Sequence, residues 1–306
     1  MKKRVVFITL CAAMCAVLTA CGGKAAPADN TSAPPDSTAH TVQTTAQETT
    51  AETLPESKQV SFDTSWEYAA ESVVHTDSAT MFYSQAKNRK GKVICVNAGH
   101  GCSGAQDKYT YCHPDKSPKV TGGSTAEGSL KAVCISSGTT LLDGTSEGEA
   151  TLNLALILKQ QLLDNGYDVL MVRTGEDAQL DNIARTVFAN NNADCHISLH
   201  YDSTESDKGL FCCTVPEVES YRAMEPVKSY FNEHMRLADS IVDGERQAGV
   251  KIHGDGKVAI DLTQTSYSTV SSALVEVGDR ASDHSPAHQS DIAKGIVNGI
   301  NIYFKE

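Results

Sequence analysis

From residue 92 onward, short apolar runs alternate with longer segments in which apolar residues recur at helical spacing. The apolar runs predict strands at 93–96, 167–172, 195–200 and 273–277. The periodic segments predict helices at 149–165, 180–190 and 227–242, with a closing helix marked by Ile292, Ile296, Ile300 and Tyr303. Strands separated by helices are typical of a mainly parallel sheet. We therefore expect one α/β domain over 92–306, with a mainly parallel, mixed sheet flanked by helices.

The N-terminal end has a different pattern. Residues 1–20 combine a basic start, an apolar run and small residues, which is the layout of a secretory signal too short to span a membrane comfortably. The following "LTAC" resembles the bacterial lipobox, which implies that Cys21 is lipidated and anchors the protein to a membrane. The alternative is an ordinary cleaved signal followed by a chance cysteine.

Residues 21–58 are rich in Thr, Pro and Ala and contain no aromatic residue. Such a segment buries too little apolar surface to offset its ordering entropy, so we expect a disordered tether. Residues 59–91 form a transitional segment whose apolar side chains suit a helix or a short strand packed on the main domain.

Charge and cysteine content narrow the choice of partners and of metal sites. The chain of 306 residues has a formal net charge of −12, which argues against a nucleic-acid partner. No Cys-x-x-Cys spacing is present, so a structural zinc cluster has no support. Seven cysteines follow Cys21, and an odd number leaves at least one unpaired; we expect disulfides among Cys102, Cys112 and Cys134.

Polar residues that can bind a metal lie at the ends of three of the predicted strands. His100 lies after the first strand, His200 closes "CHISLH", and Glu276 closes "ALVEV". Glu149 opens a helix and can face the same edge, where α/β sheets gather their ligands. Two imidazoles and a carboxylate are a common catalytic zinc set, and a second carboxylate can act as the base.

Four stretches, "VNAGHG", "EATLNLALILKQQLLDNGYDVLMVRTGED", "ARTVFANNNADCHISLHYDS" and "ALVEVG", occur in this order over about residues 92–305. Together they resemble the zinc-dependent N-acetylmuramoyl-L-alanine amidases of the cell-wall hydrolase type. The resemblance implies cleavage of the amide between the lactyl group of N-acetylmuramic acid and the first L-alanine of the peptidoglycan stem peptide. It also implies one Zn²⁺ per chain.

The resemblance further implies roles for five residues. His100, Glu149 and His200 match the zinc ligands, Glu276 matches the catalytic glutamate, and Arg185 matches an arginine that we expect to brace the site through hydrogen bonds.

Neighbouring residues offer alternatives to two of these ligands. Glu147 lies beside Glu149, but only Glu149 keeps the four-residue spacing to Asn153-Leu154. His196 precedes His200 by four residues, about 13 Å along a strand, which is too far for one metal ion, so we expect a structural role. His113, His253, His284 and His288 match no motif and are expected at the surface.

The chain departs from the family pattern in two regions that bear on the site. The insertion at about 105–145 is longer than usual, polar and rich in Gly and Ser. It is either an ordered segment beside the cleft, with Cys112 and Cys134 as a candidate disulfide, or a solvated loop. After Glu276-Val277-Gly278 comes Asp279-Arg280, in place of the usual apolar residue and asparagine.

These observations predict an extracytoplasmic, lipid-anchored, monomeric zinc amidase that acts on peptidoglycan and binds no nucleic acid. Two rival functions remain: another zinc-dependent cell-wall peptidase, and a non-catalytic peptidoglycan-binding lipoprotein.

Overall fold

The structure, a computed structural model, describes residues 54–306. The predictions of a signal peptide at 1–20, of lipidation at Cys21 and of a tether over most of 21–58 therefore lie outside the described residues. The end of the expected tether is ordered, because Ser57 and Lys58 belong to the first strand. None of the helices in the described part of the chain is long and apolar enough to cross a membrane.

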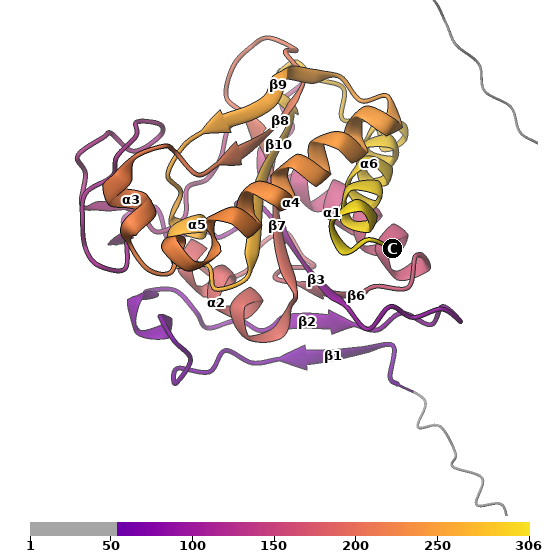
Figure 1. Ribbon diagram of the computed structural model, residues 1–306, viewed down its shortest axis with the longest axis horizontal. Coiled ribbons are helices and arrows are strands. Elements are labelled where there is room, and N and C mark those ends of the chain that lie inside the picture. Colours follow the sequence, from indigo (N-terminus) through magenta and orange to yellow (C-terminus); the bar gives the residue numbers. More distant parts are fainter. Residues whose placement is uncertain (1–53) are drawn as a thin grey trace, which may run out of the picture. The chain divides into compact units, whose positions relative to one another are not determined.

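An eight-stranded sheet forms the centre of the domain, in the order β1-β2-β6-β3-β7-β10-β8-β9 (Figure 1). The strands are β1 (Ser57–Val60), β2 (Ala79–Phe82), β3 (Val93–Ala98), β6 (Asp168–Met171), β7 (Cys195–Asp202), β8 (Leu210–Thr214), β9 (Ile252–Ala259) and β10 (Ser271–Asp279). The four central strands β6, β3, β7 and β10 are parallel. β1 and β2 add antiparallel strands at one edge, and β8 pairs antiparallel with β10 at the other side.

Helices cover both faces of this sheet (Figure 1). The helices that pack over the larger core are α1 (Glu147–Asp164), α4 (Val227–Ala248) and α6 (Pro286–Phe304). The opposite face is covered by α2 (Asn182–Asn192), together with η1 (Ala69–Glu71) and α5 (Thr263–Tyr267). A short helix, α3 (Glu219–Ala223), precedes α4. The predicted α/β class with a mainly parallel, mixed sheet is confirmed.

Strand alternation places the polar residues of β7 and β10 on one face. Ile197 and Leu199 of β7 point into the larger core, so His200 points to the other side. Glu276 of β10 is the register partner of His200 and therefore lies beside it on the same face.

The sequence pattern found the central elements and left others unassigned. The transitional segment, expected to form a helix or a short strand, supplies β2 and the second half of β1, which extend the main sheet. β9, "IHGDGKVA", is mostly exposed at the sheet edge and therefore lacks the apolar run that identifies a buried strand.

The insertion is an ordered segment with its own two-stranded antiparallel sheet, β4 (Tyr109–Tyr111) and β5 (Lys131–Val133). Asp261 anchors it to the domain: its buried carboxylate accepts from Lys119 Nζ at 2.7 Å and from the backbone N–H of Val120 at 2.8 Å. His113 Nε2 lies 3.0 Å from the same carboxylate. The expectation that His113 lies at the surface is therefore wrong, because its ring is buried against Asp261.

The candidate disulfide within the insertion does not form. All seven cysteines from Cys95 to Cys213 are free thiols in the structure. The N–H of Cys112 bonds to Leu130 and that of Cys134 to Lys108, so the two cysteines lie at opposite ends of the two-stranded sheet. An offset of four residues corresponds to about 13 Å, well beyond the Cα separation that a disulfide can bridge.

Candidate active site

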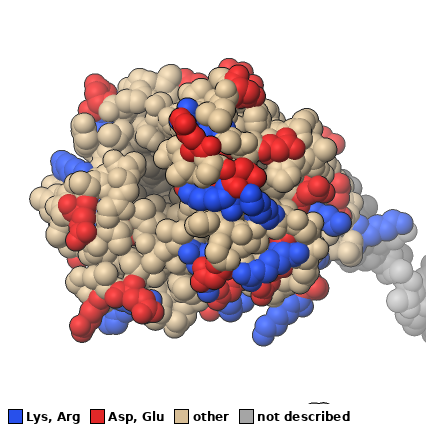
Figure 2. Space-filling model, turned by 90° about the horizontal axis from the view of Figure 1, so that it is seen from above, with Lys and Arg blue, Asp and Glu red and all other residues tan. Residues whose placement is uncertain are grey.

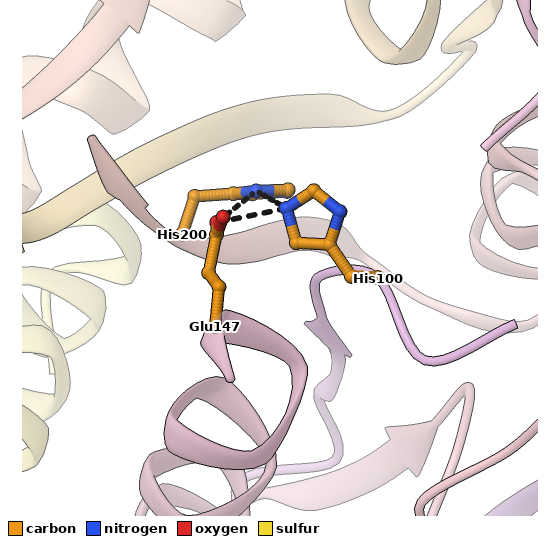
Figure 3. A group of neighbouring side chains, drawn as sticks. All are labelled: His100, Glu147 and His200. Atoms are coloured by element: carbon orange, nitrogen blue, oxygen red, sulfur yellow. Dashed lines mark hydrogen bonds and ion pairs between the residues drawn. The ribbon is translucent and has the colours of Figure 1, made fainter. Parts of the chain in front are cut away.

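Two imidazoles and one carboxylate converge at the carboxyl ends of the central strands β3 and β7 (Figure 3). His100 Nε2 lies 2.8 Å from Glu147 Oε1 and 3.0 Å from His200 Nδ1. The third side of this triangle, from His200 Nδ1 to Glu147 Oε1, measures 3.1 Å. Figure 3 shows the three side chains pointing toward one another from separate segments of the chain.

His100 follows β3 in a backbone conformation that side chains rarely adopt, with φ of 61°. A Cβ on the preceding Gly99 would lie 2.5 Å from His200 Cε1 and 2.7 Å from the carbonyl oxygen of Leu199. Glycine is thus required at 99 because the backbone passes directly against the second imidazole.

Glu147 is the first residue of α1 and is buried, with 3% of its surface exposed. Its carboxylate accepts hydrogen bonds from the backbone N–H groups of Thr139, at 2.8 Å, and Tyr201, at 3.1 Å. Burial alone would raise the pKa of this carboxyl, but hydrogen bonds with His100 and His200 outweigh burial and lower it. Glu147 is therefore held as an anion between the two imidazoles.

The prediction of Glu149 as the third ligand is wrong, because the carboxylate beside the two imidazoles is that of Glu147. Glu149 is exposed, and its backbone N–H donates to the Oγ of Ser146, the N-cap of α1. The helix starts two residues earlier than predicted, which turns Glu147 toward the imidazoles and Glu149 toward solvent.

The donor set fits a tetrahedral zinc ion. Two ligands bound at about 2.0–2.1 Å in a tetrahedral arrangement lie about 3.4 Å apart, close to the three separations found here. The Nδ1 of His100, its other ring nitrogen, lies 2.9 Å from the carbonyl oxygen of Ser136. A bond from this nitrogen to a backbone carbonyl is the usual support of a metal-binding histidine, because it fixes the ring and its tautomer.

Glu276 is the remaining carboxylate at this edge of the sheet. It lies on β10 beside His200, and burial, followed by the nearby charge of Glu147, raises its pKa well above the usual range. Its buried Oε2 makes no hydrogen bond within the described part of the chain. This buried oxygen is therefore an unmet hydrogen-bonding group, which a substrate or a water molecule in the site can satisfy.

Two buried arginines hold the turn that carries His100. Arg185 of α2 donates to the carbonyl oxygens of Ala98, at 2.9 Å, and His100, at 2.7 Å. Arg173, which follows β6, donates to the carbonyls of Gly99, at 2.8 Å, and Gly148, at 2.6 Å. Burial lowers the pKa of Arg185 to about 9 and that of Arg173 to about 10.

Sequence reasoning missed three residues near the cluster. Arg173 joins the His100 turn to the start of α1, and Ser136 supports the His100 ring. Gly138 packs so closely that a Cβ there would lie 2.8 Å from the His100 ring. Only Arg173 had a visible signal, as a charged residue directly after a buried strand. His196 lies outside the cluster, fully buried on β7.

A cavity of about 480 Å³ adjoins the cluster, and its lining includes Gly101, Gly148 and Glu149. Two of these residues are chain neighbours of His100 and Glu147. Figure 2 shows a hollow in the face of the molecule seen from above, with acidic and basic side chains interspersed on the surface around it. No continuous basic surface of the kind that binds nucleic acid is visible on this face.

Comparison with known proteins places these features in a family. The family of N-acetylmuramoyl-L-alanine amidases matches residues 94–302. No curated protein matches the chain. Among solved structures, the N-acetylmuramyl-L-alanine amidase Ami1 from Mycobacterium abscessus matches at 23% identity with a TM-score of 0.54, over 70% of this chain and 99% of that one. Ami1 from Mycobacterium smegmatis matches at 20% identity with a TM-score of 0.55, over 72% of this chain and 99% of its own. The family match includes His100, Glu147, His200 and Glu276, and the chain therefore belongs to the N-acetylmuramoyl-L-alanine amidase family.

Proposed function

We propose that this protein hydrolyses the amide bond between the lactyl group of N-acetylmuramic acid and the first L-alanine of peptidoglycan, using one zinc ion held by His100, Glu147 and His200. The observation that carries this proposal is the convergence of these three side chains within 3.1 Å of one another. The family match supports the choice of bond.

The chemistry divides between the metal and Glu276. When bound, a zinc ion supplies Lewis acidity that polarises the amide carbonyl and lowers the pKa of a water molecule toward neutrality. Glu276 accepts the proton of the attacking water and delivers it to the alanine nitrogen, so that the amine leaves uncharged. Its position beside His200 and its unpartnered Oε2 support this role.

The residues around the cluster keep the imidazoles and the carboxylate in place. Arg185 and Arg173 fix the turn that carries His100, and Ser136 orients its ring. The N–H groups of Thr139 and Tyr201 hold the Glu147 carboxylate, so its orientation does not depend on the bound ion.

The N-terminal segment supports an extracytoplasmic location. The signal-like residues 1–20 and the lipobox-like "LTAC" suit export followed by lipidation of Cys21. A monomeric protein tethered in this way reaches peptidoglycan above the membrane that anchors it.

Digestion of purified peptidoglycan tests the proposed reaction. The protein should release stem peptides with a free N-terminal alanine, identified by their masses, and a chelator should abolish their release. Glu276→Gln should retain zinc and lose about 10²–10⁴-fold in turnover, because it removes the proton-transferring group. Cleavage within the stem peptide would instead identify a peptidase, and the absence of any cleavage by zinc-loaded protein would indicate a binding protein.

A further inference from the structure

The outer face of the β4–β5 sheet carries exposed aromatic and lysine side chains. Thr110, at the centre of β4, is buried, so its neighbours Tyr109 and Tyr111 point to the opposite side of this small sheet. Tyr109 is 54% exposed, and Tyr111 is paired across the sheet with Lys131. We define the insertion face as Tyr109, Tyr111, Lys116 and Lys131.

The two lysines of the insertion face gather on one aromatic ring. Lys131 Nζ lies 4.6 Å and Lys116 Nζ 5.0 Å from the centroid of the Tyr111 ring. Neither lysine forms an ion pair with an acidic side chain of residues 54–306. The ring therefore concentrates two positive charges that lack an anionic partner.

The insertion face is rigidly mounted and close to the metal-binding cluster. The buried Asp261 carboxylate ties the segment between the two strands to the domain, through Lys119 and Val120. At the other end, Ser136 contacts His100 only three residues after β5 ends at Val133. Val133, the register partner of Tyr109, is at most about 11 Å of chain from Ser136, and Lys131 is at most about 18 Å from it. A polymer that extends beyond the site passes within reach of this face.

We infer that the insertion face binds the length of peptidoglycan that extends beyond the scissile amide. Lys116 and Lys131 receive stem-peptide carboxylates, and the exposed ring of Tyr109 packs on the apolar side of a sugar. Because the chain has a net charge of −12, a polymer that carries carboxylates needs such a local cationic site to approach it. The inference rests on the proposed function, since it assigns a second contact to the same substrate.

Sedimentation with insoluble peptidoglycan tests the inference without turnover. The background is the full chain with Glu276→Gln, and the variants add Tyr109→Ala or the pair Lys116→Ala and Lys131→Ala. Loss of two exposed ion pairs should weaken binding about tenfold at low salt, and the difference should shrink as salt rises. The matched control replaces Lys87 and Lys294, two exposed lysines that form no ion pair with residues 54–306, and should bind as the background does.

Equal weakening in the control, or unchanged binding in both face variants, would overturn the inference. A second measurement compares substrates in the active enzyme: the face variants should lose kcat/KM on intact peptidoglycan and keep it on a small soluble muropeptide. An equal loss of kcat/KM on both substrates would also contradict a docking role for the insertion face. Failure of the unsubstituted enzyme to cut either substrate would contradict the amidase reaction, whereas the sedimentation result stands independently of it.

Discussion

Glu147 and Glu149 share the first turn of α1, but only Glu147 reaches the two imidazoles. Position in the helix accounts for the difference. Glu147 is the first helical residue and faces the end of the sheet, whereas Glu149 bonds through its N–H to the Ser146 cap and projects into solvent. The two carboxylates therefore provide a matched pair of substitutions, two residues apart and identical in chemistry.

We expect Glu147→Gln to lose bound zinc and Glu149→Gln to keep it. A neutral amide at 147 removes the anionic ligand, and activity should fall by at least about 10³-fold, because a bound metal ion supplies several kcal/mol of transition-state stabilisation. At 149 the same change alters only an exposed charge near a helix N-terminus, worth about 0.3–1 kcal/mol of stability. Zinc content after dialysis measures the retention of the metal. A chemical or thermal unfolding curve for each variant measures the change in stability.

Loss of zinc from the Glu149 variant alone would instead identify Glu149 as the ligand, as its spacing to Asn153-Leu154 predicts. Loss of zinc from both variants, with unfolding curves that show both to be folded, would contradict the assignment of Glu147 as the only carboxylate ligand.

The sequence does contain a signal that distinguishes the two glutamates. "SEGE" at 146–149 has the spacing of a capping box, in which a serine caps the helix and a glutamate follows three residues later. This pattern places the helix start at Glu147 and assigns Glu149 to the cap. Both histidine positions could be predicted, because His100 directly follows a buried strand and His200 lies near the end of another. Ser136 contacts the His100 ring through its carbonyl oxygen, at 2.9 Å, and its Oγ, at 3.2 Å, but it matches no motif.

Among the elements, the segment that follows β10 connects the loops around the site. Arg280 Nε donates to the carbonyl of Thr140 at 2.7 Å, and its backbone carbonyl accepts from Leu142 at 2.9 Å. Its guanidinium also pairs with Glu205 at 2.9 Å, in the loop after β7. Arg280 thus joins the loop that supports His100 and Glu147 to the strand ends that carry His200 and Glu276.

We expect Arg280→Ala to lower zinc affinity by about tenfold, because the loop that supports the ligands loses a fixed attachment. The free energy of unfolding should fall by only about 1–2 kcal/mol, as the lost hydrogen bonds are partly exposed. Zinc affinity is measured by competition with a chromophoric chelator. Arg280→Lys should recover part of the affinity, since an ammonium can still donate to the Thr140 carbonyl.

Arg236 provides the control for this experiment. It lies on α4, donates to the carbonyl of Tyr303 and pairs with Glu233, on the helices of the larger core. Arg236→Ala should reduce stability to a similar extent and leave zinc affinity unchanged. Equal loss of zinc affinity in both variants would assign the effect of Arg280 to general destabilisation.

Element prediction succeeded where burial imposed a clear pattern. All four residues of β6 are buried, and the run at 167–172 identified it. The insertion could not be resolved in this way, because β4 and β5 are three residues each and only Thr110 among them is buried. Its order depends on long-range bonds to Asp261, about 140 positions away, which no local pattern encodes.

At the scale of the whole molecule, the fold brings together residues that are far apart in the chain. His100 and His200 are separated by 100 positions and meet because β3 and β7 are adjacent and parallel. Glu276 joins them because β10 pairs with the other side of β7. The prediction of a parallel sheet was therefore sufficient to place three of the four residues at one edge, before any side-chain contact was known.

Zinc titration of metal-stripped protein is the most direct measurement of whether this cluster holds one catalytic ion. The stripped protein should be inactive on a small muropeptide, and amide hydrolysis should rise with added zinc and saturate at one equivalent per chain. Full activity in the stripped protein, or saturation only at two or more equivalents, would contradict a single ion held by His100, Glu147 and His200.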